Sequence, residues 1–146
     1  MAQDFVIRLV GPEDEPLILA QREGLFDYAA DPEQTRAFLA SELCEMVIAV
    51  EGEDILSFAS GTILLHPDKD PSMFINEVGT RDDYQRQGLA TKVTQALIAR
   101  ARALDCDGIW LGTEPDNAPA LGLYRKLGAE ERTIVGFGWD GAFDLE

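Results

Sequence analysis

The hydrophobic pattern changes its period once in this chain, near residue 88, and this change constrains the fold more than any other feature. Residues 73–80 form a short apolar run that is typical of a strand. From Gly88 to Leu104, apolar residues recur at helical spacing, which predicts an amphipathic helix. Its apolar face comprises Leu89, Val93, Ala96, Leu97, Ala101 and Leu104. A strand followed by a long helix indicates an α/β sheet with helices packed on it.

Further apolar runs and turn signals predict the remaining elements. Strands are expected at 5–10, 46–51, 55–65, 73–80, 108–113 and 133–139, and helices at 13–26, 32–43, 88–104 and 117–127. Asp31 and Asn117 are suitable N-caps for the second and last helices, and Gly128 ends the last one. The order β-α-α-β-β-β-α-β-α-β predicts a mixed α/β sheet with helices on both faces.

Length and composition limit the class of protein. The chain has 146 residues, close to the roughly 150 of one domain, so we expect a single domain over 1–146. No apolar run approaches the roughly 20 residues of a membrane span. The N-terminus lacks the positive start of a secretory signal, so we expect a cytoplasmic protein. Two cysteines, Cys44 and Cys106, are too few for a zinc site, and no metal is expected.

The charge is strongly acidic. There are 12 Lys and Arg residues against 27 Asp and Glu, a net charge of −15. This field would repel a nucleic-acid backbone, so no nucleic-acid or membrane partner is expected. Residues 1–80 carry 4 of the 12 basic and 16 of the 27 acidic groups. The acidity indicates either a solvated surface that aids solubility or a region that attracts a cationic ligand.

The segment from Gln85 to Ala90 lies between the expected strand and the long helix. A diphosphate binds where backbone N–H groups point into one concavity, and small residues such as Gly88 and Ala90 allow its close approach. The helix N-terminus adds a partial positive charge, and Arg86 adds a full one. The pattern also occurs in ordinary turns, but its position between strand and helix favours an anion site.

A second motif covers residues 117–128. Asn117 and Tyr124 are two helical turns apart and therefore share one face of the expected helix. Taken alone, Asn117 could be only an N-cap and Tyr124 only a half-buried core aromatic.

Together the two motifs resemble the GNAT superfamily of acyl-CoA-dependent N-acetyltransferases. The first family pattern, R/Q-x-x-G-x-G/A, is matched by Gln85, Gly88 and Ala90, and the second, N-x-x-A-x-x-L-Y-x-K-x-G, by Asn117, Ala120, Leu123, Tyr124, Lys126 and Gly128. The resemblance implies acetyl-CoA as co-substrate. It implies that the donor is held by Val78, Gly79, Thr80, Gln85, Arg86, Gln87, Gly88, Leu89, Ala90, Thr91, Asn117 and Ala120.

The resemblance also implies direct attack of an amine on acetyl-CoA, without an acyl-enzyme. Glu77 is the candidate base, or else a carboxylate that only anchors the substrate. Gly79 would permit a bulge in its strand, with Glu77 and Gly79 on one face and Val78 on the other. Tyr124 is the candidate proton donor, or hydrogen-bond partner, for the departing thiolate sulfur.

A closer resemblance is to the short aminoglycoside 3-N-acetyltransferases, which carry acids where Glu77 and Glu114 stand; this chain has Asn117 and Ala118 where they have two further acids. The expected substrate contacts are Asp27, Glu77, Glu114 and Asp116. The expected acceptor is a primary amine of a cationic small molecule. A polyamine, an amino acid, a protein N-terminus or lysine, and a non-catalytic acetyl-CoA-binding module remain alternatives. A homodimer is a further expectation.

Overall fold

The computed structural model describes residues 4–144. It divides into two compact units, Met1–Gly112 and Thr113–Glu146, and each is described separately. Within the described residues, no helix combines the length and the apolar character needed to cross a membrane.

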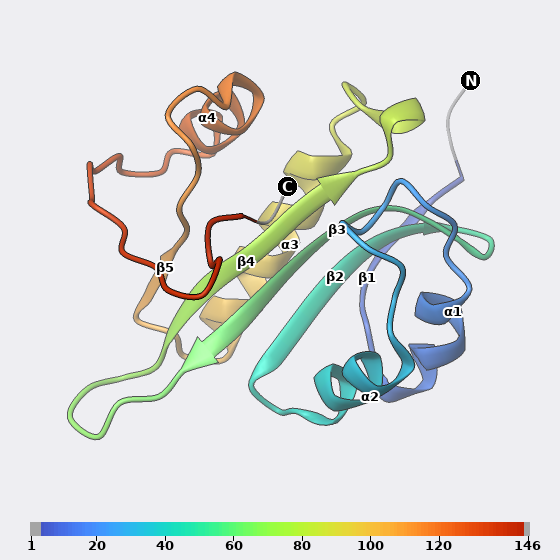
Figure 1. Ribbon diagram of the computed structural model, residues 1–146, viewed down its shortest axis with the longest axis horizontal. Coiled ribbons are helices and arrows are strands. Elements are labelled where there is room, and N and C mark those ends of the chain that lie inside the picture. Colours follow the sequence, from blue (N-terminus) through green and yellow to red (C-terminus); the bar gives the residue numbers. More distant parts are fainter. Residues whose placement is uncertain (1–3, 145–146) are drawn as a thin grey trace. The chain divides into compact units, whose positions relative to one another are not determined.

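The first unit contains a five-stranded sheet in the order β1-β2-β3-β4-β5 (Figure 1). The strands are β1 (Val6–Leu9), β2 (Cys44–Glu51), β3 (Asp54–Leu64), β4 (Ser72–Thr80) and β5 (Gly108–Trp110). The first four pair antiparallel with their neighbours, whereas β5 is parallel to β4. The mixed α/β sheet that the sequence predicts is therefore confirmed.

Helices cover both faces of this sheet, as predicted (Figure 1). On one face α3 (Leu89–Ala103) buries Leu89, Val93, Leu97 and Ala101 against Val47, Ala49, Leu56 and Met73. On the other face α1 (Glu15–Leu19) and α2 (Pro32–Ala40) contribute Ile18, Phe38 and Leu39 to a core with Met46, Ile48, Val50, Ile55 and Phe58. Because both faces of β2 are buried, its sequence is a continuous apolar run without polar alternation.

The first helix is shorter than the predicted 13–26. It consists of a 3-10 turn, η1 (Pro12–Asp14), followed by α1, and it ends at Leu19. The backbone carbonyls of Arg22 and Glu23 instead accept hydrogen bonds from the guanidinium of Arg81, at 3.3 and 2.8 Å. A long-range partner therefore replaces the next helical turn. The second helix also ends early, at Ala40, because Ser41 has an extended backbone.

The second unit contains one helix, α4 (Ala118–Lys126), among its described residues. The Asn117 side chain caps its N-terminus by accepting from the Ala120 N–H at 3.3 Å. Gly128 follows its end with a left-handed backbone (φ 81°), as the sequence predicts.

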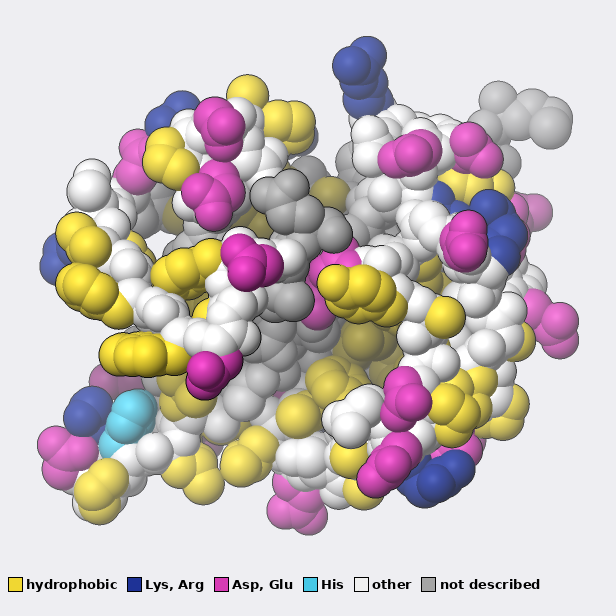
Figure 2. Space-filling view, viewed as in Figure 1, with side chains coloured by type: hydrophobic (Ala, Val, Ile, Leu, Met, Phe, Trp, Pro, Cys, Tyr) yellow, Lys and Arg dark blue, Asp and Glu magenta, His cyan; other side chains and the backbone are white. Residues whose placement is uncertain are grey.

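The predicted final strand over 133–139 is wrong, because these residues form no regular secondary structure. A strand needs a partner for its backbone hydrogen bonds, and the described residues of the second unit contain no other strand. Glycines at 136 and 138 weaken strand formation further. The segment instead exposes its apolar side chains, and Figure 2 shows hydrophobic atoms along its outer surface. The neighbouring prediction of a strand over 108–113 was too long, since β5 ends at Trp110.

Candidate active site

A β-bulge in β4 determines which way Glu77 faces. Ser60 of β3 pairs with Glu77 and the next residue, Gly61, pairs with Ile75, so Asn76 is an extra residue on β4. Strict alternation from Ile75, which is buried on the α3 face, would direct Glu77 to that same face. The extra residue reverses this, and both Asn76 and Glu77 line a cavity on the α1/α2 face. The bulge that Gly79 would permit lies instead at Asn76, three positions earlier in the strand.

Gly79 allows the Phe58 ring to pack closely against the β4 backbone. A Cβ atom there would lie 2.8 Å from the Phe58 ring and 3.3 Å from the Leu25 carbonyl oxygen. Gly79 therefore faces the same side of the sheet as Glu77, while Val78 packs on the α3 side, as alternation beyond the bulge predicts.

The cavity beside Glu77 has a volume of about 310 Å³. It lies within the first unit, and its lining is contributed by α1, the loop before α2, α2 itself and strands β2–β4. The lining residues are Ile18, Phe26, Tyr28, Ala30, Asp31, Gln34, Thr35, Phe38, Met46, Phe58, Ser60, Asn76 and Glu77. It is a concavity of mostly apolar character with a few polar groups, which is the usual form of a small-molecule site.

The Glu77 carboxylate is partly desolvated by the surfaces around it, although it remains accessible to solvent. Burial raises its pKa above the ordinary value, and the negative charge of Asp27 raises the pKa further. No hydrogen bond or ion pair within residues 4–144 engages this carboxylate. A carboxylate with a raised pKa and no committed partner is well suited to accept a proton.

Beyond Phe74, no strand of the first unit pairs with the edge of β4 that faces β5. The two strands pair only from Ser72 to Phe74, where Phe74 and Trp110 are in edge-to-face contact at 4.5 Å. The Arg81 N–H donates to the Leu56 carbonyl of β3 at 2.9 Å. Because N–H groups alternate along a strand, those of Val78 and Thr80 point to the open edge, where an extended amide chain could pair with them.

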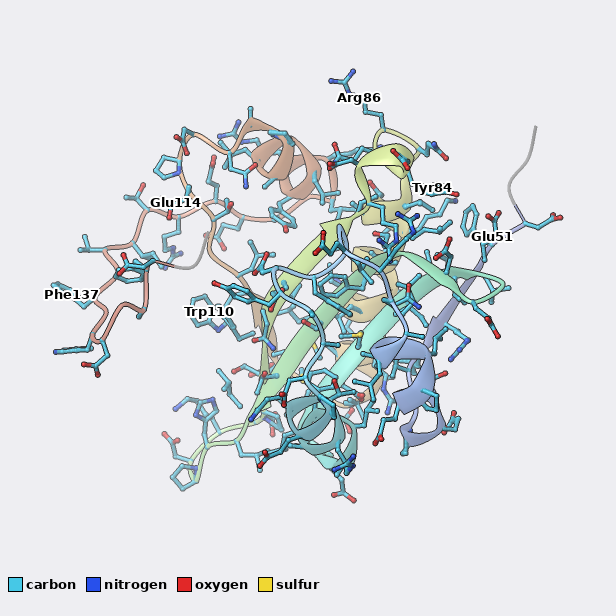
Figure 3. The ribbon with its side chains drawn as sticks, turned by 45° about the vertical axis from the view of Figure 1, so that its right-hand side comes forward. Glu51, Tyr84, Arg86, Trp110, Glu114 and Phe137 are labelled. Carbon is cyan, nitrogen blue, oxygen red and sulfur yellow. The ribbon has the colours of Figure 1, made fainter. Side chains whose placement is uncertain are left out.

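The turn between β4 and α3 has the form of an anion site. Arg86 and Gly88 both adopt left-handed backbones, with φ of 65° and 80°. No side chain caps α3, so the N–H groups of its first turn are free for a ligand. A Cβ atom on Gly88 would have no neighbour within 4 Å, and the space before the helix is therefore open. The Arg86 side chain projects from this turn (Figure 3). These features fit a diphosphate.

The remaining predicted residues belong to the second unit. Glu114 and Asp116 are exposed in the segment before α4. The Asn117 side chain is used as the helix cap, and it also donates to the Thr113 hydroxyl at 3.3 Å. Burial raises the pKa of the Tyr124 phenol, which therefore keeps its proton at neutral pH. The structure thus brings Asp27 and Glu77 together in the first unit, and it places Asn117, Ala120 and Tyr124 on one short helix of the second.

Sequence reasoning missed the apolar wall of the cavity and the role of Arg81. Phe26 and Phe58 are far apart in the chain, and no local spacing indicates that their rings meet at 5.0 Å. An arginine at the end of a strand carries no local signal, yet Arg81 is 2% exposed and holds the 21–23 loop. Within residues 4–144, no three His, Cys, Asp or Glu side chains are grouped as metal ligands.

The acetyltransferase (GNAT) family model matches residues 14–129, which is most of the chain. The chain belongs to the GNAT acetyltransferase family. This GNAT protein is similar over a short stretch to an L-methionine sulfoximine/L-methionine sulfone acetyltransferase of Pseudomonas aeruginosa. The two are 42% identical over 55 residues, which are 38% of this chain and 32% of the relative. A mycothiol acetyltransferase of Pseudarthrobacter chlorophenolicus is 34% identical over an alignment of 128 residues that covers 80% of this chain and 39% of the relative. These matches thus cover about a third of the relatives' own lengths.

Solved structures share the GNAT fold over almost the whole chain. An aminoglycoside acetyltransferase, meta-AAC0020, from an uncultured soil metagenomic sample, in complex with sisomicin, has a TM-score of 0.82 at 17% identity, over 93% of this chain and 95% of that one. The aminoglycoside N-acetyltransferase AAC(6')-Iy, solved with a bisubstrate analog of CoA and acetylneamine, has a TM-score of 0.78 at 19% identity, over 94% of this chain and 99% of that one. At these identities the likeness shows the fold alone.

Proposed function

We propose that this chain is an acetyl-CoA-dependent N-acetyltransferase that acts on the primary amine of a cationic small molecule, and that its two units form one domain. The observation that carries the proposal is the placement of Glu77 on β4. Its carboxylate faces a small-molecule cavity and makes no hydrogen bond within the described residues. The same strand has an edge that is unpaired beyond Phe74, and the turn after it leads to the uncapped N-terminus of α3. The family model, which spans residues 14–129, supports the single domain.

The donor is proposed to bind along β4 and the turn after it. The N–H groups of Val78 and Thr80 pair with the pantetheine amides, and Gly79 keeps the strand backbone free of a side chain. The turn from Gln85 to Thr91 holds the diphosphate, with Arg86, Gln87, Gly88, Leu89 and Ala90 between them. Asn117 and Ala120 of α4 contribute the remaining contacts. Acetyl-CoA supplies an activated thioester, so the chain needs no nucleophile of its own.

The acceptor amine arrives as an ammonium and must lose a proton before it can attack. We propose that Glu77 anchors the ammonium and then accepts this proton, directly or through one water. The negative charge of Asp27 makes Glu77 a stronger base and also attracts the cation. Glu114 and Asp116 supply further negative charge to the acceptor. Tyr124, which is protonated at neutral pH, donates to the departing sulfur.

Aminoglycosides are one class of cationic amine that this proposal includes, with the 3-N position as the expected site from the sequence resemblance. The solved neighbours support the class, since several are aminoglycoside acetyltransferases, but one of them is an AAC(6') enzyme. The other candidates are polyamines, free amino acids, and a protein N-terminus or lysine. A module that binds acetyl-CoA without turnover is the non-enzymatic alternative.

The test is release of free CoA thiol from acetyl-CoA by purified protein, with and without each amine. The panel contains aminoglycosides, spermidine, amino acids, simple alkyl and arylalkyl amines, and a lysine peptide. Thiol release that depends on an amine supports the proposal. Acetyl-CoA binding by calorimetry without release for any amine would favour the binding module, and absence of binding would contradict both.

Substituting Gly88 by alanine is expected to weaken acetyl-CoA binding. A Cβ at φ 80° imposes a left-handed strain of about 1–2 kcal/mol, which the turn relieves by leaving the geometry that holds the diphosphate. The KM for acetyl-CoA should therefore rise about 5–30-fold, with the acceptor KM unchanged. Gly52→Ala is the matched control, because Gly52 also has a positive φ (61°) and open space but lies in the β2–β3 turn. If Gly52→Ala raised the KM equally, the turn at Gly88 would not be the donor site.

Removing the Tyr124 hydroxyl is expected to lower kcat about tenfold while leaving both KM values nearly unchanged. The reason is that one hydrogen bond to the sulfur, worth about 1–1.5 kcal/mol, is lost in the transition state. Tyr124→Phe retains the aromatic ring, so the melting temperature should change little. Steady-state kinetics of the two proteins measure the effect. An unchanged kcat would remove Tyr124 from the mechanism.

We further propose that the chain forms a homodimer through its C-terminal segment. Ile134, Val135, Phe137, Trp139 and Phe143 are each between 64% and 79% exposed. Apolar side chains of this size are rarely gathered on the surface of a monomer. Sedimentation should therefore give the mass of two chains, and Phe137→Asp together with Trp139→Asp should return the mass of one. A monomeric wild-type protein at micromolar concentration would contradict the dimer.

We place the activity in the cytoplasm. Cys44 and Cys106 are both free thiols in the structure, which fits a reducing compartment.

A further inference from the structure

The lining of the cavity beside Glu77 narrows the class of acceptor. We propose that the acceptor is a monocationic primary amine joined by a short linker to one aromatic ring or branched aliphatic group. This inference rests on the proposed function, because it assigns the cavity to the acceptor of that reaction. The proposal excludes a polyhydroxylated polycation as the preferred acceptor.

The walls of the cavity are apolar. Phe26 and Phe58 meet edge to face with their ring centroids 5.0 Å apart. Phe38 of α2, Met46 of β2 and Ile18 of α1 complete this wall. Phe58, Met46 and Ile18 are all at least 92% buried, so this wall is fixed by the core and not by mobile surface groups. Contact between such a surface and a hydrocarbon group is favourable because it buries apolar area, whereas a hydroxyl placed there would find no hydrogen-bond partner in the wall.

The cavity has one carboxylate that makes no hydrogen bond or ion pair within the described residues. Two acids line it, Asp31 and Glu77. The Asp31 side chain is already engaged, because it accepts the Gln34 N–H at 2.8 Å as the cap of α2. The amide of Asn76 is also engaged, since it donates to the Thr62 hydroxyl at 2.8 Å. Of the two acids in the lining, Glu77 is the one without a hydrogen-bond partner among the described residues, and we assign it to the ammonium. Asp27 is not part of the lining and adds negative charge beside Glu77.

A polycationic acceptor does not match this distribution. Each additional ammonium or hydroxyl placed against the phenylalanine wall would lose its water without gaining a partner. An amine with one charge and one apolar group meets both parts of the cavity, with its nitrogen at Glu77 and its ring against Phe26 and Phe58. The volume of about 310 Å³ is at the lower end of the range for ligand sites, which fits a single ring.

The experiment compares kcat/KM of the wild-type protein for four amines at fixed, saturating acetyl-CoA. These are 2-phenylethylamine, ethylamine, spermidine and a tricyclic aminoglycoside. We expect 2-phenylethylamine to exceed ethylamine by about 100-fold, since even one methylene in an apolar pocket changes kcat/KM by about 10–200-fold. We also expect it to exceed both polycations. A higher kcat/KM for spermidine or the aminoglycoside would overturn this inference and leave the proposed function standing, whereas no turnover with any amine would overturn both.

A substitution in the wall tests whether Phe26 causes the preference for 2-phenylethylamine over ethylamine. Phe26→Gln should reduce the ratio of 2-phenylethylamine to ethylamine about tenfold, because the wall loses an aromatic face. Leu65→Gln is the control, since Leu65 is 65% exposed and does not line the cavity. An unchanged ratio in Phe26→Gln, with a folded protein by circular dichroism, would contradict the assignment of this wall to the acceptor. The wild-type comparison stands even if the variant fails to fold.

Discussion

Replacing Glu77 by glutamine is expected to reduce kcat by about 10²–10⁴-fold, the usual contribution of a positioned general base. Glutamine has almost the same shape but cannot accept the proton of the ammonium. The bulge at Asn76 directs residue 77 into the cavity, and the other acid of the lining, Asp31, is held as the cap of α2. The acetyl-CoA KM should remain unchanged, since Glu77 does not touch the donor turn.

The pH profile distinguishes a base from a mere anchor. Glu77 works only when ionised, so kcat/KM should rise with pH through its pKa. Burial and Asp27 raise that pKa, and the rise in activity should occur at higher pH than for an ordinary glutamate. Asp27→Asn removes a repulsive charge, so it should lower the pKa of Glu77 and move the same limb to lower pH. In Glu77→Gln the limb should disappear.

Glu53→Gln is the matched control for this substitution, because Glu53 is exposed in the β2–β3 turn. It makes the same change of charge, and its kinetics should equal those of the wild type. If Glu77→Gln raised only the acceptor KM and kept both kcat and the acidic limb, Glu77 would be an anchor without a role in proton transfer.

The second large effect is expected from Arg81→Met, which should lower the free energy of unfolding by about 3 kcal/mol. The Arg81 guanidinium is buried with no carboxylate partner in the described chain. Its donors reach the backbone carbonyls of Ile55 and Glu23, both at 2.8 Å, and the Gln21 amide oxygen at 3.0 Å. Methionine fills similar space but leaves the buried Ile55 carbonyl without a partner. The melting temperature should fall by roughly 6–12 °C.

Arg102→Met is the control for Arg81, because the Arg102 side chain is exposed on α3 and makes no hydrogen bond or ion pair within the described residues. Its stability should change by less than about 0.5 kcal/mol. Arg81 also holds the loop that leads into Leu25 and Phe26, so Arg81→Met should raise the acceptor KM more than the acetyl-CoA KM. Equal melting temperatures for the two variants would mean that the buried hydrogen bonds of Arg81 contribute nothing net.

The sequence predicts the parts of the fold that depend on local pattern. The helical spacing from Leu89 to Ala101 indicates α3, and the glycine at 88 indicates the turn before it, because both depend on residues close together in the chain. The same holds for the caps at Asp31 and Asn117, whose side chains accept the backbone N–H groups of residues 34 and 120.

The features that the sequence does not predict depend on distant partners. The first helix ends at Leu19, and Arg81, about 60 residues away, donates to carbonyls of the loop that follows it. The bulge at Asn76 is a change in the pairing of β3 and β4, and it depends on both strands. The glycine at 79 is a local signal for a bulge, but no bulge forms there. The segment 133–139 has a strand-like composition, but composition cannot provide the neighbouring strand that it lacks.

In the candidate site, too, the sequence predicts the features that depend on neighbouring residues and misses those that depend on distant ones. The donor turn was predictable because glycine, small residues and a helix start are all local. The acidic charge of the sequence indicates a solvated surface or a region that attracts a cation, whereas the wall of the acceptor cavity is mainly apolar. That wall is assembled from α1, the loop after it, α2, β2 and β3, and a charge count over a segment cannot show which side chains meet.

The most direct test of this account is to incubate the protein with acetyl-CoA labelled with ¹³C in the acetyl group and with 2-phenylethylamine, and to identify the products by mass spectrometry and NMR. The account predicts the label on the amine nitrogen, one free CoA thiol for each amide formed, and loss of both products in Glu77→Gln. The account would be contradicted if thiol were released but no amine of the panel, 2-phenylethylamine included, became labelled. Full activity of Glu77→Gln would also contradict it.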